Sequence, residues 1–152
     1  MASFLDKMKE ALNKEHKKNI ACFVDGPNIL RKELGVDLDK VKKKLSKYGR
    51  IKIARVLLDQ YASDKLIEAV TNQGFDVTIV PSDVDVALAV EATEAIFNDS
   101  IETIAVVSRD SDFKPLLAKA KEHGKETIVV GLEPDFSTAL RNTADVVIDL
   151  RE

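Results

Sequence analysis

The stretches IACFVDGPN at residues 20–28 and IAVVSRDSD at residues 104–112 decide the fold of this chain. In each, a run of apolar residues ends abruptly at polar residues that include aspartate. Runs that are apolar on both faces are typical of strands covered by helices on both sides of a sheet. Each stretch therefore predicts a buried strand that is followed directly by a polar loop.

Further apolar runs extend a regular alternation around these two strands. Strands are predicted at 20–24, 51–58, 75–80, 103–107 and 127–130, with a short sixth at 146–148. Strict alternation of strand and helix predicts right-handed crossovers and an α/β fold, a three-layer doubly wound sandwich. We expect a mainly parallel sheet of five or six strands in the order 3-2-1-4-5, plus an N-terminal helix.

The helical segments between the strands are predicted from stripes of apolar residues. Residues 84–97 are apolar nearly all round, so we expect a deeply packed helix there. Gly74 and Gly124 follow two of the helices and predict their C-terminal caps. The remaining stripes are Val41, Leu45 and Tyr48; Leu66, Ile67 and Val70; Phe113, Leu116, Leu117 and Ala120; and the short segment 136–142.

Length and composition limit the class of protein. A chain of 152 residues with 45% apolar residues is long enough for one domain with its own core. We expect residues 1–18 to form an amphipathic helix and residues 19–152 to form the domain. The single cysteine, Cys22, excludes an intrachain disulfide and suits a reducing compartment. No stretch reaches the roughly 20 apolar residues of a membrane span and no signal-peptide pattern opens the chain, so we predict a cytoplasmic protein.

The net charge of −3 conceals two segments of opposite charge. Residues 40–55 contain eight Lys and Arg and no acid, whereas residues 82–112 contain eight Asp and Glu and a single base. This division fits either a binding surface beside a metal site or two solvated faces, and charge alone does not decide between them. If it is a binding surface for nucleic acid, we expect four residues on or near one helical face to carry it, Lys40, Lys43, Lys44 and Lys47.

Three aspartates follow the carboxyl ends of predicted strands. Asp25 follows the first strand, Asp85 opens the helix after the third, and Asp110 follows the fourth. In an open α/β sheet, ligands bind beyond the carboxyl ends of the strands where the strand order reverses, so we expect the three to converge. Converging carboxylates repel one another unless they share a cation, and oxygen ligands without Cys or His select Mg²⁺ or Mn²⁺. Such ions act typically on phosphate esters.

Each of these acids also has a purely structural interpretation. Asp25 before Gly-Pro suits a turn, Asp83 or Asp85 suits the cap of the following helix, and Asp110 or Asp112 suits the cap of the next. For any one acid alone the cap is the stronger interpretation. Three acids predicted at one edge of the sheet favour the metal site.

The other polar groups are weaker candidates. Glu91 lies about 120° around the helix from Asp85, and Asp59, after the second strand, is expected too far from the switch point. His16 and His123 sit among Lys and Glu and are expected to be solvated. No G-x-G-x-x-G or Walker A motif is present, so nucleotide-cofactor binding has no sequence support.

Three strings resemble the NYN family in their order and spacing: FVDGPN at 23–28, VDVALAVEA at 84–92 and VSRDSDFKPLL at 107–117. The closing ALRNTADVVIDL, at 139–150, is similar to the family's C-terminal segment. The resemblance implies a PIN-like fold and a metal-dependent ribonuclease that cuts RNA by hydrolysis with an activated water. It implies these site positions: Asp25, Asp85 and Asp110 as metal-binding acids, Asp112 as a fourth acid, Asn28 as the asparagine of the first motif, and Ser108 as a hydroxyl that orients a carboxylate.

The sequence also departs from the family pattern. Ser82-Asp83 stands where members often have Lys-Gly, Glu91 replaces a common aspartate, and Arg109 replaces a common glycine. The exchange at Asp83 leaves open a second interpretation, an RNA-binding or regulatory module with weak or no activity. A metal-dependent phosphatase or receiver-like domain is a third, and Pro27 argues against the phosphatase because a second aspartate would be needed there.

Residues 1–18 are the one appendage to the predicted domain. Their apolar residues recur at helical spacing and comprise Phe4, Leu5, Met8, Ala11 and Leu12. A helix this short is marginal alone in water, so its apolar stripe must pack against something. Docking on the chain's own domain and docking on a second copy, as a homodimer, both remain open.

Overall fold

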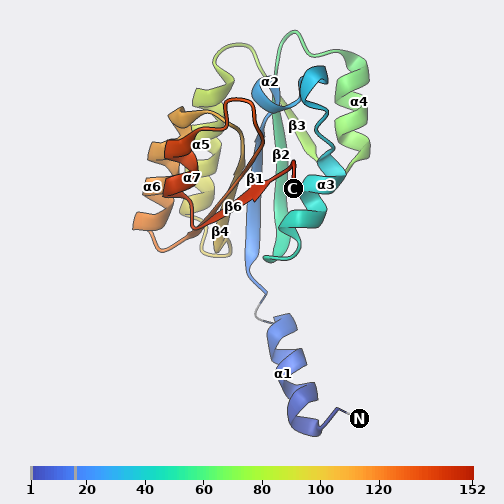
Figure 1. Ribbon diagram of the computed structural model, residues 1–152, viewed down its shortest axis with the longest axis vertical. Coiled ribbons are helices and arrows are strands. Elements are labelled where there is room, and N and C mark those ends of the chain that lie inside the picture. The colour runs from blue at the N-terminus through green and yellow to red at the C-terminus, as the bar shows by residue number, and fades with distance from the viewer. Residues whose placement is uncertain (1, 16) are drawn as a thin grey trace.

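The sheet is all-parallel and has six strands in the order β3-β2-β1-β4-β5-β6 (Figure 1). The structure is a computed structural model and describes residues 2–15 and 17–152. Its strands are β1 (Asn19–Asp25), β2 (Arg50–Asp59), β3 (Asp76–Val80), β4 (Thr103–Val107), β5 (Glu126–Gly131) and β6 (Val146–Asp149). The predicted strand order is confirmed, and the short sixth strand extends the sheet beyond β5.

Helices join the successive strands, as the alternating pattern predicts. They are α1 (Phe4–Glu15), α2 (Gly26–Ile29), α3 (Leu38–Leu45), α4 (Asp64–Asn72), α5 (Val84–Ile96), α6 (Lys114–Glu122) and α7 (Thr138–Thr143), with 3₁₀ turns η1 (Lys32–Leu34) and η2 (Ser111–Phe113). Gly74 and Gly124 have φ of 86° and 77°, the left-handed conformation of the cap positions predicted for them. The last helix begins at Thr138 and not at residue 136, because the Ser137 hydroxyl accepts the N–H of Leu140 at 3.1 Å and caps it there.

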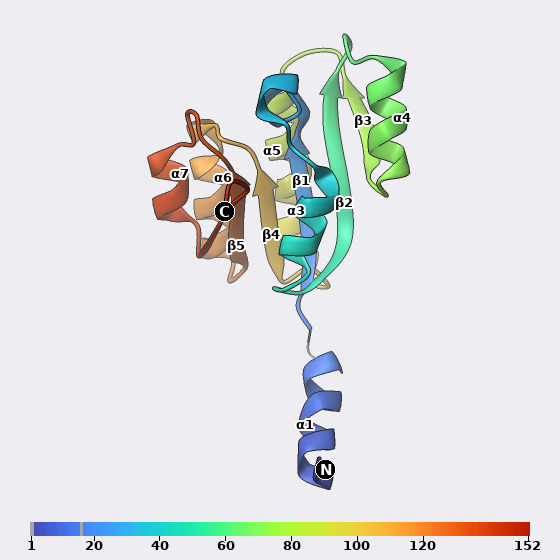
Figure 2. The same cartoon turned by 45° about the vertical axis from the view of Figure 1, so that its right-hand side comes forward.

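Two apolar cores lie on opposite faces of the sheet. Helices α3 and α4 cover one face, and α5, α6 and α7 cover the other (Figure 2). Strand β1 supplies both cores, since Cys22 and Val24 point into the first and Ala21 and Phe23 into the second. This alternation explains why the strand is apolar at every one of these positions.

The prediction that the helix at 84–97 is deeply packed is wrong. Leu88 and Ala92 on the inner face of α5 are buried, but Val86, Val90 and Phe97 are 59%, 59% and 63% exposed. An apolar outer face is buried only where a further element covers it, and no element of the described chain does so here.

Tyr48 does not belong to the buried stripe of α3. The helix ends at Leu45, and Tyr48 follows in the turn before β2 with 45% of its surface exposed. The Ser46 hydroxyl donates to the carbonyl of Lys43 at 2.7 Å, which satisfies one of the free carbonyls at the helix end.

Helix α1 stands apart from the domain, beyond the edge at which β1 begins (Figures 1 and 2). The predicted helix is confirmed over Phe4–Glu15, and its apolar side chains Phe4, Leu5 and Met8 are 78%, 62% and 46% exposed. Met1 and His16 lie outside the described residues. None of the described helices is both long and apolar enough to cross a membrane.

Candidate metal centre at the carboxyl edge of the sheet

The first part of the site lies where the neighbouring strands β1 and β4 end. Val24 pairs with Val107, so the next residues, Asp25 and Ser108, come to the same level of the sheet. The Ser108 hydroxyl donates to Oδ2 of Asp25 at 3.2 Å, and both residues are buried. Gly26 lets α2 begin at once, because a Cβ atom there would lie 2.5 Å from the carbonyl oxygen of Leu57.

Three aspartates from two further elements converge at this edge. Asp85 comes from the first turn of α5, Asp110 is the N-cap of η2, and Asp112 lies within η2. One carboxylate oxygen from each lies within 4.8 Å of those of the other two. The strand order brings Asp85 close to Asp110 and Asp112, although more than 20 positions of sequence separate them.

Hydrogen bonds to neighbouring residues fix the orientation of the Asp110 and Asp85 carboxylates. Oδ1 of Asp110 accepts the N–H of Asp112 at 2.9 Å, and the N–H of Asp110 donates to the Ser108 hydroxyl at 3.2 Å. Oδ1 of Asp85 accepts the N–H of Val86 at 3.0 Å. Asp110 therefore caps η2 and also belongs to the cluster, so the two interpretations of this residue are compatible. Asp83 is the N-cap residue of α5, but its side chain makes no capping hydrogen bond.

The chemistry of the cluster suits a hard divalent cation. Three ionised carboxylates this close repel one another, and a shared cation removes that repulsion. The donors are oxygen atoms only, as Mg²⁺ and Mn²⁺ prefer, and no Cys or His is among them. The acidic triad can therefore bind a metal ion through Asp85, Asp110 and Asp112.

Asp25 lies deeper than the triad and has unusual electrostatics. The pKa of its carboxyl is raised from 3.8 to about 6, chiefly by burial and also by the nearby charges of Asp110 and Asp85, while the hydrogen bonds from Ser108 and the Asn28 backbone lower it. The predicted metal set is Asp25, Asp85 and Asp110, whereas the geometric cluster contains Asp112 in place of Asp25. Asp25 nevertheless lines the same hollow as Asp85 and Asp110.

This hollow, which we call the acidic cleft, has a volume of about 340 Å³. It is lined by Asp25, Pro27, Asn28, Arg31, Asp59, Ser82, Asp83, Val84, Asp85 and Asp110. The expectation that Asp59 lies too far from the switch point is wrong. Strand β2 is the neighbour of β1, so the residue at its carboxyl end reaches the same edge.

Arg31 is a cleft residue that the sequence reasoning missed. It is the one basic residue among those lining the cleft, and its Nε donates to the carbonyl of Pro27 at 3.2 Å. Arg31 lies between α2 and η1, and no local pattern in the sequence points to this placement. A guanidinium here offers a partner for an anionic group that enters the cleft.

Asn28 holds Arg109 and joins two segments of the site. Its side-chain oxygen accepts the backbone N–H of Arg109 at 2.9 Å and Nε of Arg109 at 3.3 Å. The same guanidinium donates to the carbonyls of Asn28 and Pro134, each at 2.8 Å, and Arg109 is only 7% exposed. The arginine that replaces a common glycine therefore ties α2 to the loop after β5.

The four lysines predicted to bind RNA lie on and after α3, outside the lining of the acidic cleft. Lys40 and Lys44 donate to the carbonyls of Leu150 and Glu152 at 2.6 and 2.8 Å, so both hold the end of the chain. Lys43 and Lys47 are exposed, and neither forms an ion pair within the described residues.

Glu91 and His123 also lie outside the cleft, as expected. Glu91 accepts from Arg55 at 3.1 Å in an ion pair on the side of α5. His123 is exposed at the end of α6, where its ring meets that of Phe97 edge-on with the centroids 4.8 Å apart.

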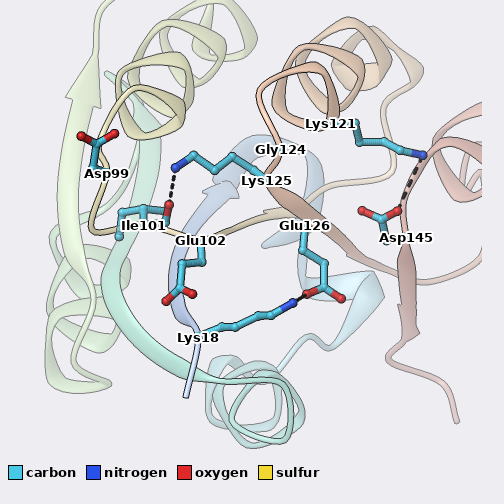
Figure 3. A pocket seen from close by; sticks show the side chains of 9 residues that line it. All are labelled: Lys18, Asp99, Ile101, Glu102, Lys121, Gly124, Lys125, Glu126 and Asp145. Atoms are coloured by element: carbon cyan, nitrogen blue, oxygen red, sulfur yellow. Dashed lines mark hydrogen bonds and ion pairs between the residues drawn. The ribbon is translucent and has the colours of Figure 1, made fainter. Parts of the chain in front are cut away.

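A larger hollow of about 590 Å³ lies at the opposite edge, where β1, β4 and β5 begin (Figure 3). Most of its charged side chains have partners: Lys18 bonds Glu126, Lys121 lies 3.7 Å from Asp145, and Lys125 donates to the carbonyl of Ile101 at 2.5 Å. The edge from which strands start is not where doubly wound sheets bind ligands. We therefore give this hollow a structural role at the starting edge of the sheet and not a catalytic one.

Comparison with known proteins agrees with the fold and adds a family. Residues 19–151 match the NYN domain. An uncharacterized protein of Methanocaldococcus jannaschii is 57% identical over 144 residues, which are 95% of this chain and 60% of that protein. The chain thus spans about three fifths of the length of this relative. A crystal structure of a Vibrio parahaemolyticus protein of unknown function has a TM-score of 0.79 at 21% identity, and the match covers 90% of this chain and 94% of the other.

Proposed function

The chain belongs to the NYN domain family, a family of PIN-like nucleases, and from that premise we propose that it is a divalent-metal-dependent ribonuclease that hydrolyses RNA phosphodiester bonds. The observation that carries the proposal is the convergence of Asp85, Asp110 and Asp112 at the carboxyl edge, with the buried Asp25 beside them. A family match alone gives a class of fold and activity. The acidic cluster supplies the chemistry that hydrolysis of a phosphodiester requires.

The residues of the cleft have separate roles in this proposal. Asp85, Asp110 and Asp112 hold Mg²⁺ or Mn²⁺, with Asp25 as a further acidic ligand. A bound ion of this kind activates a water, orients the phosphate and stabilises charge on the leaving oxygen. Ser108 holds the Asp25 carboxylate in place, and Asn28 holds the loop that carries Asp110 through its bonds to Arg109. Arg31 is placed to bind a phosphate oxygen at the cleft mouth.

RNA would be held outside the cleft by the basic segment that includes α3. Lys43 and Lys47 are the exposed members of the predicted set, while Lys40 and Lys44 add charge beside the chain end that they bind. Phosphate contacts of this type supply affinity without sequence preference.

The test is cleavage of end-labelled RNA by purified protein in Mg²⁺, in Mn²⁺ and in EDTA. We expect cleavage with either metal, none in EDTA, and a loss of at least about 100-fold in rate for Asp110→Asn, because a metal ligand is removed. Asp99→Asn is the matched control, since Asp99 is an exposed acid at the opposite edge. Cleavage that persists in EDTA, or equally in Asp110→Asn, would exclude the proposal.

A second candidate function is RNA binding without turnover, and Asp83 is the observation that favours it. Asp83 lines the acidic cleft where family members often carry Lys-Gly, so an anion replaces a cation near the place of the phosphate. The variant Ser82→Lys/Asp83→Gly restores the common pair. A parent that binds RNA without cutting it, together with a variant that cuts it in Mn²⁺, would establish the binding module.

A further inference from the structure

We propose that helix α1 of one copy docks on the outer face of α5 in a second copy of this chain. The two surfaces are the α1 stripe, defined by Phe4, Leu5 and Met8, and the α5 stripe, defined by Val86, Val90 and Phe97. This inference does not depend on the proposed enzymatic function.

Both stripes are apolar, exposed and without a partner in the described chain. Phe4 and Met8 are four residues apart, as are Val86 and Val90, so each pair lies on one face of its helix. These side chains are between 46% and 78% exposed, and they are six of the ten large apolar residues exposed in the described part of the chain. Helices α1 and α5 have 12 and 13 residues, so the two helices match in length at roughly 18–20 Å.

A hollow beside the α5 stripe gives the surface the shape that receives a helix. The hollow has a volume of about 390 Å³ and runs between α5 and α6. It is lined by Ala89, Thr93 and Phe97 from α5 and its C-cap, by Pro115, Leu116, Lys119 and His123 from α6 and its C-cap, and by Asp112 from η2. Rows of side chains on one helix pack into such grooves on another. The edge-on contact of Phe97 with His123 closes one end of the groove.

The charges around the two stripes are complementary. Helix α5 contains no base, and Glu94 is its acid available to a partner, because Asp85 belongs to the acidic triad and Glu91 pairs with Arg55. Around the α1 stripe, Lys7 and Lys9 lie on its two flanks and both are exposed. A lysine that meets Glu94, which is exposed on the outer side of α5, adds attraction and sets the orientation of the docked helix.

The connection between α1 and β1 is too short for α1 to reach this face of its own domain. From Glu15 to Asn19 there are four backbone steps, which span at most about 14 Å. A helix on the outside of α5 lies two packed layers from the sheet, and with layers about 9–10 Å apart that is roughly 18–20 Å. An α1 helix seated in this groove therefore comes from a second copy.

Reciprocal docking gives a closed, two-fold arrangement. Each copy gives one helix and receives one, so the same pair of surfaces is used twice, as in most soluble homo-oligomers. Docking also explains how a 12-residue helix, marginal alone in water, keeps its structure.

The test is disulfide trapping between two single-cysteine additions to the full chain. Chains carrying Met8→Cys are mixed with mass-tagged chains carrying Val90→Cys and oxidised mildly. The native Cys22 does not interfere, because it is buried and burial raises the pKa of its thiol to about 12. Tyr61→Cys replaces Val90→Cys in the matched control. Tyr61 is 84% exposed, follows the carboxyl end of β2 and does not belong to the α5 stripe.

We expect the mixed disulfide between the Met8→Cys chain and the tagged Val90→Cys chain to exceed the Tyr61→Cys control by roughly 10-fold or more, since docking raises the local thiol concentration. Light scattering of the parent should give a dimer, and Val90→Glu should give a monomer with unchanged circular dichroism. Four results would overturn the proposal: disulfides only between two Met8→Cys chains, no cross-link above control, an intrachain disulfide in a chain that carries both Met8→Cys and Val90→Cys, or a parent that is monomeric at micromolar concentration.

Discussion

At the residue scale, Asp25 is the carboxyl group of the cleft with the least access to water. Its neighbours are the Ser108 hydroxyl and the backbone of α2, and the charges of Asp85 and Asp110 lie close by. Burial and these charges together make ionisation of Asp25 costly in the folded protein, and the pKa of about 6 expresses that cost.

This pKa predicts how stability depends on pH in the absence of metal. The folded-state pKa of Asp25 is raised above its ordinary 3.8, so the folded protein binds more protons than the unfolded chain between about pH 4 and pH 6. Stability therefore falls as pH rises through that window and levels off above it, by on the order of 3 kcal/mol. Urea unfolding in EDTA should show this fall in the parent and not in Asp25→Asn. Parallel curves for the two proteins would contradict the assignment.

The carboxylate cluster predicts a stabilising effect of metal. Mg²⁺ or Mn²⁺ binds only the folded protein, so at 100 times the dissociation constant it should stabilise the fold by about 2.7 kcal/mol. Asp110→Asn should remove most of this effect and raise the metal-free melting temperature, because one repelling charge is gone. Asp99→Asn should behave as the parent. A parent melting temperature that does not respond to either ion would exclude the site.

Substitutions of two arginines should have different effects: loss of Arg109 should lower stability, and loss of Arg31 should weaken RNA binding. Arg109→Ala removes the guanidinium donors to the carbonyls of Asn28 and Pro134 and to the Asn28 side chain, so we expect a loss of about 2–4 kcal/mol in urea unfolding. Arg31→Ala, at an exposed position, should change stability by less than about 0.5 kcal/mol and weaken RNA binding. Equal effects of the two variants on stability would contradict these roles.

At the scale of elements, α3 carries the prediction about RNA affinity. Lys43→Gln/Lys47→Gln should weaken binding to all RNA sequences and reduce the slope of log affinity against log salt by roughly 0.7 per lysine. Lys65→Gln, on α4, is the control at another exposed site. Fluorescence anisotropy across a range of salt concentrations measures both quantities. An unchanged slope in the double variant would mean that this segment is only a solvated face.

The elements also show which features the sequence can predict. The strand order and the positions of Asp25, Asp85 and Asp110 follow from alternating patterns, because parallel strands must end at one edge. The exposure of α5 does not follow, since an apolar stripe is the same in sequence whether or not another element covers it. Arg31 was missed because its place in the cleft depends on the path of the chain after α2, which no local pattern encodes. Asp59 was placed too far away, although the predicted order already makes β2 the neighbour of β1.

At the scale of the whole molecule, the fold separates two surfaces. The acidic cleft lies at the carboxyl edge of the sheet, and α1 leaves from the opposite edge (Figure 1). In the proposed dimer, β1, α5 and η2 of each copy would therefore still position the cleft residues of that same copy. The α/β core is built in the same way as in the Vibrio parahaemolyticus structure, despite 21% identity.

The most direct test of metal-dependent RNA hydrolysis is the chemistry of the product ends. An activated water attacks phosphorus and expels the 3′ oxygen, so cleavage in Mn²⁺ should leave 5′-phosphate and 3′-hydroxyl ends. The cleft residues include no histidine to promote attack by the ribose 2′-hydroxyl. Mass spectrometry of the fragments distinguishes the two routes, with Asp110→Asn protein as the blank for contaminating nucleases. Products with 5′-phosphate ends, absent from the blank, are the predicted result; 2′,3′-cyclic phosphates, or RNA left intact in Mn²⁺, would contradict the account.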